Sequence, residues 1–223
     1  FANGCAAVAT DNGAELVGKE GSGTIPHALE NIFAYYFGRN NAVVESTKAF
    51  NEVIDPAVPR IALIDYANRE ITDSIATAEV LNGNLYGVRT DPCGENLSEG
   101  GRSGNRKFWE GNGVTVYGVR ALRKALNEAS HEYVKTGLSS GFSNPEKVKA
   151  FNEGEREFKM RLYDFLGAGF LDGIRTATAD VIAVGEEPDQ VDFYVGRDVE
   201  ARNITHKNGR PPKPNKKYME RVL

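Results

Sequence analysis

Cysteine is scarce in this sequence, which has only Cys5 and Cys93 among 223 residues and no Cys-x-x-Cys spacing. A zinc site or a disulfide framework needs more cysteines at closer spacing, so neither is indicated. Long apolar runs are also lacking: none approaches the ~18 residues of a membrane span, and no charged-then-apolar leader is present. We therefore expect a cytoplasmic protein with reduced thiols, no membrane partner and no export signal.

The sequence also lacks an excess of basic residues. The chain has 27 Lys and Arg against 31 Asp and Glu, a formal net charge of −4. Broad nucleic-acid surfaces need a basic face that neutralises phosphates, so nucleic acid is excluded as the main partner. Any binding of phosphate must be local, at a few placed residues.

The chain contains alternating strand and helix patterns at roughly 25-residue spacing, which predicts parallel strands joined by right-handed crossovers. Five apolar runs that end in polar or glycine residues are predicted as strands: 5–10, 60–65, 85–91, 134–139 and 165–169. Helices are predicted from Pro26 onward and at 42–53, 72–81, 115–129 and 144–151. The apolar face of the first of them is predicted to hold Ile25, Leu29, Ile32, Phe33 and Tyr36. The fold is therefore α/β, either a barrel or an open parallel sheet.

Two units are predicted along the chain. Residues 1–175 form the α/β part, and residues 176–223 hold a hairpin of strands at 179–184 and 191–195 followed by a solvated tail. Because Phe1 opens almost directly on an apolar stretch, we also expect that an N-terminal part belongs with this chain.

Polar residues stand where the predicted strands end, most clearly in the stretch Leu85–Gly94. In barrels and open sheets alike, ligands bind at the carboxyl ends of parallel strands. The residues placed there are Asp11, Asp65, Arg89, Asp91, Ser140, Gly167 and Gly169. The functional chemistry is therefore expected along one rim of the sheet.

The rim residues favour a sugar phosphate that carries an aromatic ring. Ser140 and Gly141 precede a helix, and Gly167 and Gly169 flank Ala168, so both turns could present backbone N–H groups to one anion; the alternative for each is a plain tight turn. Arg89 offers a planar cation. Asp91 could accept hydrogen bonds from sugar hydroxyls or bind a metal, and the alternative for Arg89 and Asp91 is a surface ion pair.

His27 falls on the first turn of a predicted helix, beside unpaired backbone N–H groups. The alternative to a functional role is a capping or packing histidine. A polar, glycine-rich segment at 95–113 holds Arg102, Arg106 and Lys107 around Phe108 and Trp109. It is either a surface loop or a loop that closes on an anion.

Five segments resemble nicotinate phosphoribosyltransferases, in order and at compatible spacing. They are G-T-I-P-H-A-L at 23–29, L-Y-G-V-R-T-D at 85–91, G-V-T-V-Y-G-V-R-A-L-R-K-A-L at 113–126, S-S-G-F-S-N-P-E-K-V at 139–148 and G-R-P-P-K-P-N at 209–215. The resemblance implies a type II phosphoribosyltransferase. Its fold would be an irregular, incomplete parallel α/β barrel, with C-terminal strands returning to a missing N-terminal α+β domain.

The resemblance also implies an activity. The family forms nicotinate mononucleotide and pyrophosphate from nicotinate and phosphoribosyl pyrophosphate with Mg²⁺, and it couples the reaction to ATP hydrolysis. His27, Asp65 and Asp91 become the expected catalytic residues, with His27 as the histidine that is phosphorylated. The expected substrate-binding residues are Asp11, Thr24, Arg89, Ser140, Gly141, Gly167 and Gly169. A homo-oligomer, completed by the N-terminal segment, is the expected assembly.

Two departures from the family pattern leave alternatives open. The motif that often reads D-T-Y-D is here Asp65-Tyr66-Ala67-Asn68, which removes the second acid and questions the ATP coupling. Asp11 lies roughly where relatives contact the base, and an acid suits an amide better than a carboxylate. The alternatives are a nicotinamide- or quinolinate-using phosphoribosyltransferase and a non-catalytic nucleotide-binding or sensor subunit.

Overall fold

The computed structural model describes residues 7–8, 10–15, 18–21 and 25–169, and the backbone of two short strands at 183–184 and 193–194. The helices are α1 (Asp11–Glu15), α2 (His27–Phe37), the 3₁₀ turn η1 (Arg39–Asn41), α3 (Ala42–Val53), α4 (Glu70–Leu81), α5 (Val116–Glu128) and α6 (Pro145–Phe158). The strands are β1 (Arg60–Leu63), β2 (Leu85–Thr90), β3 (Lys135–Leu138), β4 (Phe165–Leu166), β5 (Ala183–Val184) and β6 (Phe193–Tyr194).

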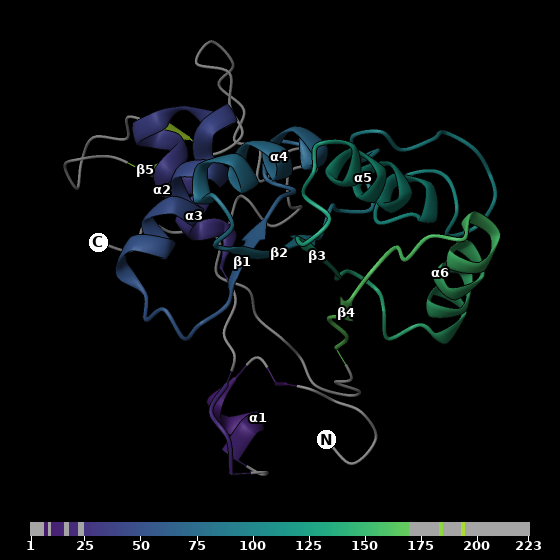
Figure 1. Ribbon diagram of the computed structural model, residues 1–223, viewed down its shortest axis with the longest axis horizontal. Helices are drawn as coiled ribbons and strands as arrows, with labels where there is room; N and C mark the ends of the chain where they lie inside the picture. The colour runs from purple at the N-terminus through teal and green to yellow at the C-terminus, as the bar shows by residue number, and fades with distance from the viewer. Residues whose placement is uncertain are drawn as a thin grey trace, which may run out of the picture.

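Strands β1 to β4 form one parallel sheet whose spatial order, β1-β2-β3-β4, is also their order along the chain. Helices α3, α4 and α5 pack side by side along this sheet, and α6 lies beyond them near β4 (Figure 1). The predicted α/β class with parallel strands is thus confirmed. A barrel also adds its strands in chain order, but the described strands do not close on themselves, so the barrel stays a prediction.

Two clusters of buried side chains hold these layers together. The first lies between β1, β2 and the helices α2 to α5, and includes Ile64, Leu85, Val88 and Leu126. The second joins α5, α6, β3 and the loop before α5, and its largest fully buried side chain is Phe151. The second cluster supports the turn after β3, because Phe142 of that turn belongs to it.

Sequence signals predicted the bounds of α3 and the starts of α5 and α6. Helix α3 has the expected bounds, Ala42–Val53. Thr115 caps α5 by accepting a hydrogen bond from Gly118 N at 3.3 Å, and Asn144 caps α6 by accepting one from Glu146 N at 2.9 Å. The expected end of α6 near 151 is wrong, because the charged residues that follow form the outer face of a helix that continues to Phe158.

The expected start of α4 at Thr72 is also wrong. The helix begins at Glu70, and its cap comes from the distant loop: Glu99 Oε2 accepts hydrogen bonds from Ile71 N at 2.8 Å and Thr72 N at 2.9 Å. Glu70 Oε2 in turn accepts one from Glu99 N at 2.8 Å. A carboxylate placed on the first N–H groups of a helix satisfies them and favours the helix dipole, so no local cap is needed.

The acidic start of α4 predicts a pH-dependent stability. Burial raises the pKa of Asp73 from 3.8 to about 6, although the Arg69 hydrogen bond and charge lower it. Because this pKa is higher in the folded than in the unfolded chain, folding takes up a proton between these values. The charged Asp73 therefore destabilises the fold progressively as pH rises through this window, and in full above it.

We expect Asp73→Asn to stabilise the protein by about 1 to 2 kcal/mol at pH 8 and to have little effect at pH 4, since each pKa unit corresponds to about 1.4 kcal/mol. Asn Oδ1 can keep the 3.1 Å bond from Arg69 Nε. Denaturant unfolding at the two pH values measures the effect, with Glu79→Gln on the exposed side of α4 as the control. Equal stability of variant and wild type at pH 8 would contradict the prediction.

Two expectations for the N-terminal part are wrong. Asp11 does not follow a strand: it begins the short helix α1, and Thr10 Oγ1 accepts a hydrogen bond from Gly13 N at 3.3 Å, as an N-cap does. In α2 the predicted apolar face is only partly buried. Ile25, just before the helix, is 6% exposed, and Leu29 and Phe33 are half-buried, whereas Ile32 and Tyr36 are 40% and 62% exposed. The buried residues of α2 are instead Glu30, Asn31 and Ala34, so this helix turns a partly polar face inward.

The expected hairpin is confirmed as an antiparallel pair, in which Ala183 pairs with Tyr194 and Val184 with Phe193. Strand β5 contacts α2. The boundary at 175 and 176 and the tail lie outside the described residues, so the two-unit division stays a prediction. Among the described helices, none combines the length and the apolar character that crossing a membrane requires.

Candidate functional site

The hydrogen-bonded ladder of the sheet continues past the carboxyl ends of its strands. Ile64 N donates to Arg89 O at 3.1 Å, Ser139 N to Thr90 O at 3.1 Å and Gly167 N to Leu138 O at 2.7 Å. The segments that follow β1, β2, β3 and β4 therefore lie side by side. The side chains at this edge can act on one ligand.

His27 and Asp65 meet at the first part of the rim. His27 Nε2 lies 3.1 Å from Asp65 Oδ1, and the Asp65 side chain is completely buried whereas the His27 ring is 30% exposed. Glu30 Oε2 lies 4.0 Å from the same nitrogen. A carboxylate only accepts, so a neutral imidazole at this contact carries its proton on Nε2. The pair is suited to hold or transfer a group on an oriented imidazole.

Arg89 occupies the centre of the rim, on the strand between β1 and β3. Its register partners are Leu63 and Gly137, and its Nη2 donates to Ile25 O at 3.4 Å, just before α2. A Cβ on Gly137 would lie 2.0 Å from the Phe165 ring, so this ring occupies the space next to Gly137. Register partners point to the same face, so the guanidinium and the ring share it. A cation beside an aromatic ring suits an aromatic acid.

Asp91, Ser140 and Gly141 are connected through a residue that the sequence analysis missed, Lys147 of α6. Lys147 Nζ donates to Ser140 O at 2.8 Å, and the negative charge of Asp91 acts on the same ammonium. Burial lowers the pKa of Lys147 to about 8 despite Asp91. The sequence signal was only a lysine in the first turn of a capped helix, which usually indicates a solvated face.

The two glycine turns differ in their surroundings. A Cβ on Gly167 would lie 3.5 Å from the Ser139 Cβ, so this turn is adjacent to the turn after β3. Gly169 is exposed, and a Cβ there would meet nothing within 4 Å. The structure brings Gly167 to the predicted anion site and leaves Gly169 at its outer side.

Asp11 is not joined to this rim. Asp11 Oδ1 accepts a hydrogen bond from Gly21 N at 2.8 Å, and α1 stands apart from the sheet in Figure 1. Thr24 lies outside the described residues. Asn68, in place of the second acid, has φ 59° and donates from Nδ2 to Leu97 O at 2.9 Å. It anchors the loop after β2, in a left-handed conformation that asparagine tolerates well.

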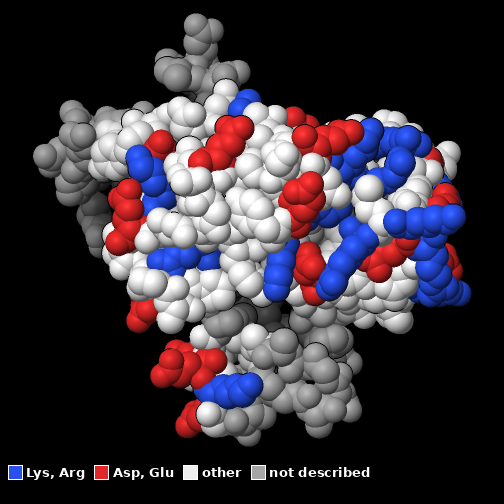
Figure 2. Space-filling view, in the orientation of Figure 1, with Lys and Arg blue, Asp and Glu red and all other residues white. Residues whose placement is uncertain are grey.

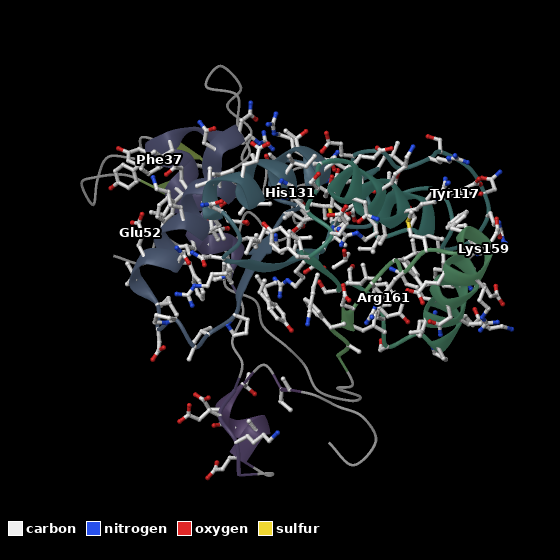
Figure 3. The ribbon with its side chains drawn as sticks, viewed as in Figure 1. Phe37, Glu52, Tyr117, His131, Lys159 and Arg161 are labelled. Atoms are coloured by element: carbon white, nitrogen blue, oxygen red, sulfur yellow. The ribbon has the colours of Figure 1, made fainter. Side chains whose placement is uncertain are left out.

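The cationic segment at 95–113 is packed against the protein. Arg106 stacks on Trp109 at 3.3 Å from the ring centroid, and it also pairs with Glu157 at 3.5 Å. Lys107 pairs with Glu146 at 2.9 Å. Lys and Arg side chains gather on the right of Figure 2, over α5 and α6, but acidic side chains lie between them. Tyr117 of α5, labelled in Figure 3, marks the same region. The surface-loop interpretation therefore fits better than a loop that closes on an anion.

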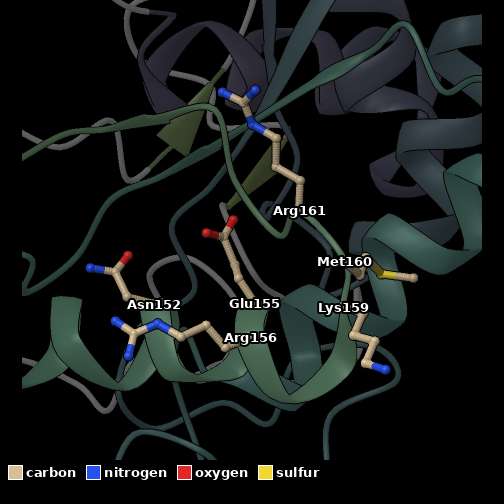
Figure 4. A pocket seen from close by; sticks show the side chains of 6 residues that line it. All are labelled: Asn152, Glu155, Arg156, Lys159, Met160 and Arg161. Carbon is tan, nitrogen blue, oxygen red and sulfur yellow. The ribbon is translucent and has the colours of Figure 1, made fainter.

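An open hollow lies at the end of α6 and is lined by Asn152, Glu155, Arg156, Lys159, Met160 and Arg161 (Figure 4). Helix α6 runs back from the end of β3 to the start of β4, so its end lies at the edge opposite the rim. Glu155 Oε1 accepts a hydrogen bond from Leu162 N at 2.8 Å, which fixes the entry to β4. We assign this hollow a structural role.

The fold and the rim together define an α/β protein with polar and charged residues along one edge of its parallel sheet, next to a histidine–carboxylate pair. No family model and no curated protein matches the chain. Among solved structures, the chain is similar to the crystal structure of nicotinate-nucleotide pyrophosphorylase from Pyrococcus furiosus, with 29% identity and a TM-score of 0.56. The match covers 76% of this chain and 36% of that one, so this chain spans well under half of that protein's length.

Proposed function

We propose that this chain is the barrel portion of a phosphoribosyltransferase of NAD biosynthesis, which forms nicotinate mononucleotide and pyrophosphate. The observation that carries the proposal is that one rim of the sheet holds the His27–Asp65 pair, Arg89, and the contact of Lys147 with Ser140 O beside the charge of Asp91. The similarity to a nicotinate-nucleotide pyrophosphorylase supports it, because cleaving a nicotinate nucleotide with pyrophosphate is the reverse of this transfer.

The proposed roles follow from charge and position. Arg89 binds the carboxylate of the pyridine ring, and Asp91 accepts hydrogen bonds from the ribose hydroxyls. The N–H groups of Ser140 and Gly141, together with those that follow Gly167, hold the phosphate of the nucleotide. The ring nitrogen displaces pyrophosphate through a cationic sugar, which needs little proton transfer. The protein accelerates the step by positioning the reactants and by stabilising charge.

Two pyridine acids can give this product. The comparison supports quinolinate, the alternative from the sequence analysis, better than ATP-coupled use of nicotinate. The contact between His27 and Asp65 is the specific observation that favours nicotinate, because it orients an imidazole that ATP could phosphorylate. The reactions differ chemically: quinolinate must lose one carboxylate as CO₂, whereas nicotinate keeps its only carboxylate.

Mg²⁺ is proposed as part of the phosphoribosyl pyrophosphate substrate. The described residues contain no group of three or more His, Cys, Asp or Glu that could hold a metal ion. Asp91 can orient the sugar of the magnesium-bound substrate without being a metal ligand of its own. The proposal also includes a homo-oligomer in the cytoplasm, with an N-terminal segment of the same enzyme completing the site.

The test uses the purified full assembly with Mg²⁺ and phosphoribosyl pyrophosphate. Pyrophosphate release is measured with nicotinate, quinolinate and nicotinamide, and CO₂ release is measured in parallel. We expect release with one of the two acids, accompanied by CO₂ only for quinolinate. Absence of release with every base would overturn the proposal, and binding of nicotinate mononucleotide without turnover would establish the sensor alternative instead.

A His27→Ala variant distinguishes the two acids further. If nicotinate is the substrate and ATP is coupled, we expect the variant to lose at least about 10-fold in ATP hydrolysis while basal pyrophosphate release changes by less than about 3-fold. His131→Ala is the matched control, because His131 lies after α5 and its ring packs on Tyr133 (Figure 3). ATP hydrolysis that is unchanged in His27→Ala would exclude phosphorylation of this histidine.

A further inference from the structure

Lys147 is buried where a lysine is costly. Only 9% of the residue is exposed, and its ammonium lies 4.6 Å from the centre of the Phe142 ring. Removing a charged group from water costs free energy unless partners replace the lost hydration. A lysine buried beside the turn that follows β3 therefore indicates a functional role for its positive charge.

The turn that Lys147 faces has an unusual backbone. Ser140 has φ 72° and Gly141 has φ 77°, so two successive residues are left-handed. A Cβ on Gly141 would have the Lys147 Nζ as its nearest neighbour, at 3.8 Å. The space that a side chain would fill at Gly141 is thus open, with the Lys147 ammonium at its edge.

The ammonium has donors left for a ligand. Of its three N–H groups, one donates to Ser140 O, and this is its only hydrogen bond to the part of the chain that the structure describes. Asp91 supports the positive charge from the end of β2. The remaining N–H groups have the chemistry that oxygens of a phosphate monoester require.

We propose that Lys147 is a phosphate ligand, whose Nζ binds an oxygen of a sugar phosphate monoester held at the turn 139–141. The inference rests on the proposed function and deepens it, because it names the cation of the phosphate site. The backbone N–H groups of Ser140 and Gly141 alone would leave the dianion without a positive charge. Lys147 also connects that site to Asp91, so the phosphate and the sugar are bound by one linked group.

The contrasting role is a structural one, in which Lys147 only holds Ser140 O. The two roles predict different losses in Lys147→Met. Methionine keeps the apolar stem over Phe142 but removes all three donors. A ligand role costs affinity only for molecules that carry the phosphate, whereas a structural role disturbs the whole rim.

The experiment is calorimetry on the full assembly with nicotinate mononucleotide, ribose 5-phosphate and nicotinate riboside, which lacks the phosphate. We expect Lys147→Met to weaken the binding of the two phosphate-bearing molecules by about 10- to 100-fold, as for the loss of a hydrogen bond to a charged group. The affinity for the riboside should not change. Lys147→Arg should recover part of the affinity, because it keeps the charge. Lys149→Met is the matched control, since Lys149 lies on the same helix with a 77% exposed side chain.

Each outcome separates the inference from the proposed function. Equal losses for phosphates and riboside, or no loss at all, would overturn the role of Lys147. If the wild-type protein binds ribose 5-phosphate but not the mononucleotide, the proposed function is overturned. The role of Lys147 can still be tested in that case, by comparing the variants with ribose 5-phosphate. If Lys147→Met does not fold, Lys147→Arg is used in its place. The inference is supported if Lys147→Arg binds ribose 5-phosphate more weakly than the Lys149→Met control does and binds the riboside as tightly as the control. Any other result overturns it.

Discussion

Arg89→Met is expected to lower kcat/KM for pyrophosphate release by about 10²- to 10³-fold, comparable to the loss of one preorganised charge-stabilising donor. Arg89 is the cation on the central strand of the rim, and its guanidinium shares a face with the Phe165 ring. The variant removes the group that we propose for the carboxylate of the pyridine base. The loss should be measured with the acid that the wild-type protein uses.

The controls separate charge from geometry. Arg89→Lys keeps a cation but loses the planar fork, so it should recover only part of the activity. Arg161→Met removes an exposed arginine from the hollow at the end of α6, where it pairs with Asp164 at 3.1 Å, and should leave kcat/KM unchanged. If Arg89→Met retained more than about a tenth of the wild-type value, Arg89 would not provide a preorganised contact of this size.

Phe151→Ala is expected to reduce the free energy of unfolding by about 3 to 5 kcal/mol, the usual cost of truncating a buried aromatic side chain. Phe151 is completely buried, and its ring packs edge-on against Phe142 at 5.1 Å and Tyr163 at 6.3 Å between ring centroids. Denaturant unfolding measures the loss. Since Phe142 belongs to the turn after β3, the cavity should also weaken the phosphate site.

The matched control for this variant is Phe37→Ala. Phe37 is 48% exposed at the end of α2 and stacks on Phe33 at 5.7 Å, so its removal should cost less than about 1 kcal/mol. A loss of similar size in both variants would contradict the assignment of Phe151 to the core. Riboside binding that survives in Phe151→Ala while phosphate binding weakens would connect the second cluster to the turn.

The elements with local signals could be predicted from the sequence. Asn144 and Pro145 determine the start of α6, and Thr115 determines the start of α5, because a side-chain cap acts within a few residues of its own position. The start of α4 could not be predicted, since Glu99 supplies its cap from a loop 28 residues away from Ile71. Such a contact exists only after the chain has folded.

The candidate site shows the same division. Parallel strands place their ends at one edge, so Arg89, Asp91 and Ser140 were predicted to lie along a common rim, and Asp65 with His27 adds to it. Lys147 was missed because its helix position alone indicates a solvated side chain. Only the packing of Phe142 and the turn around its ammonium reveals the burial. Asp11 was misplaced because Thr10 caps a helix where a strand end was expected.

The sheet adds its strands in the order in which they are synthesised, β1-β2-β3-β4, so each new strand pairs with the one that left the ribosome just before it. Connections of this kind keep the loop-closure entropy low at every step. The chain can therefore assemble vectorially during translation, with the His27 and Asp65 contact made early and the phosphate turn last. Ribosome-bound chains long enough for β2 to have left the exit tunnel should already protect the amides of β1 from hydrogen exchange.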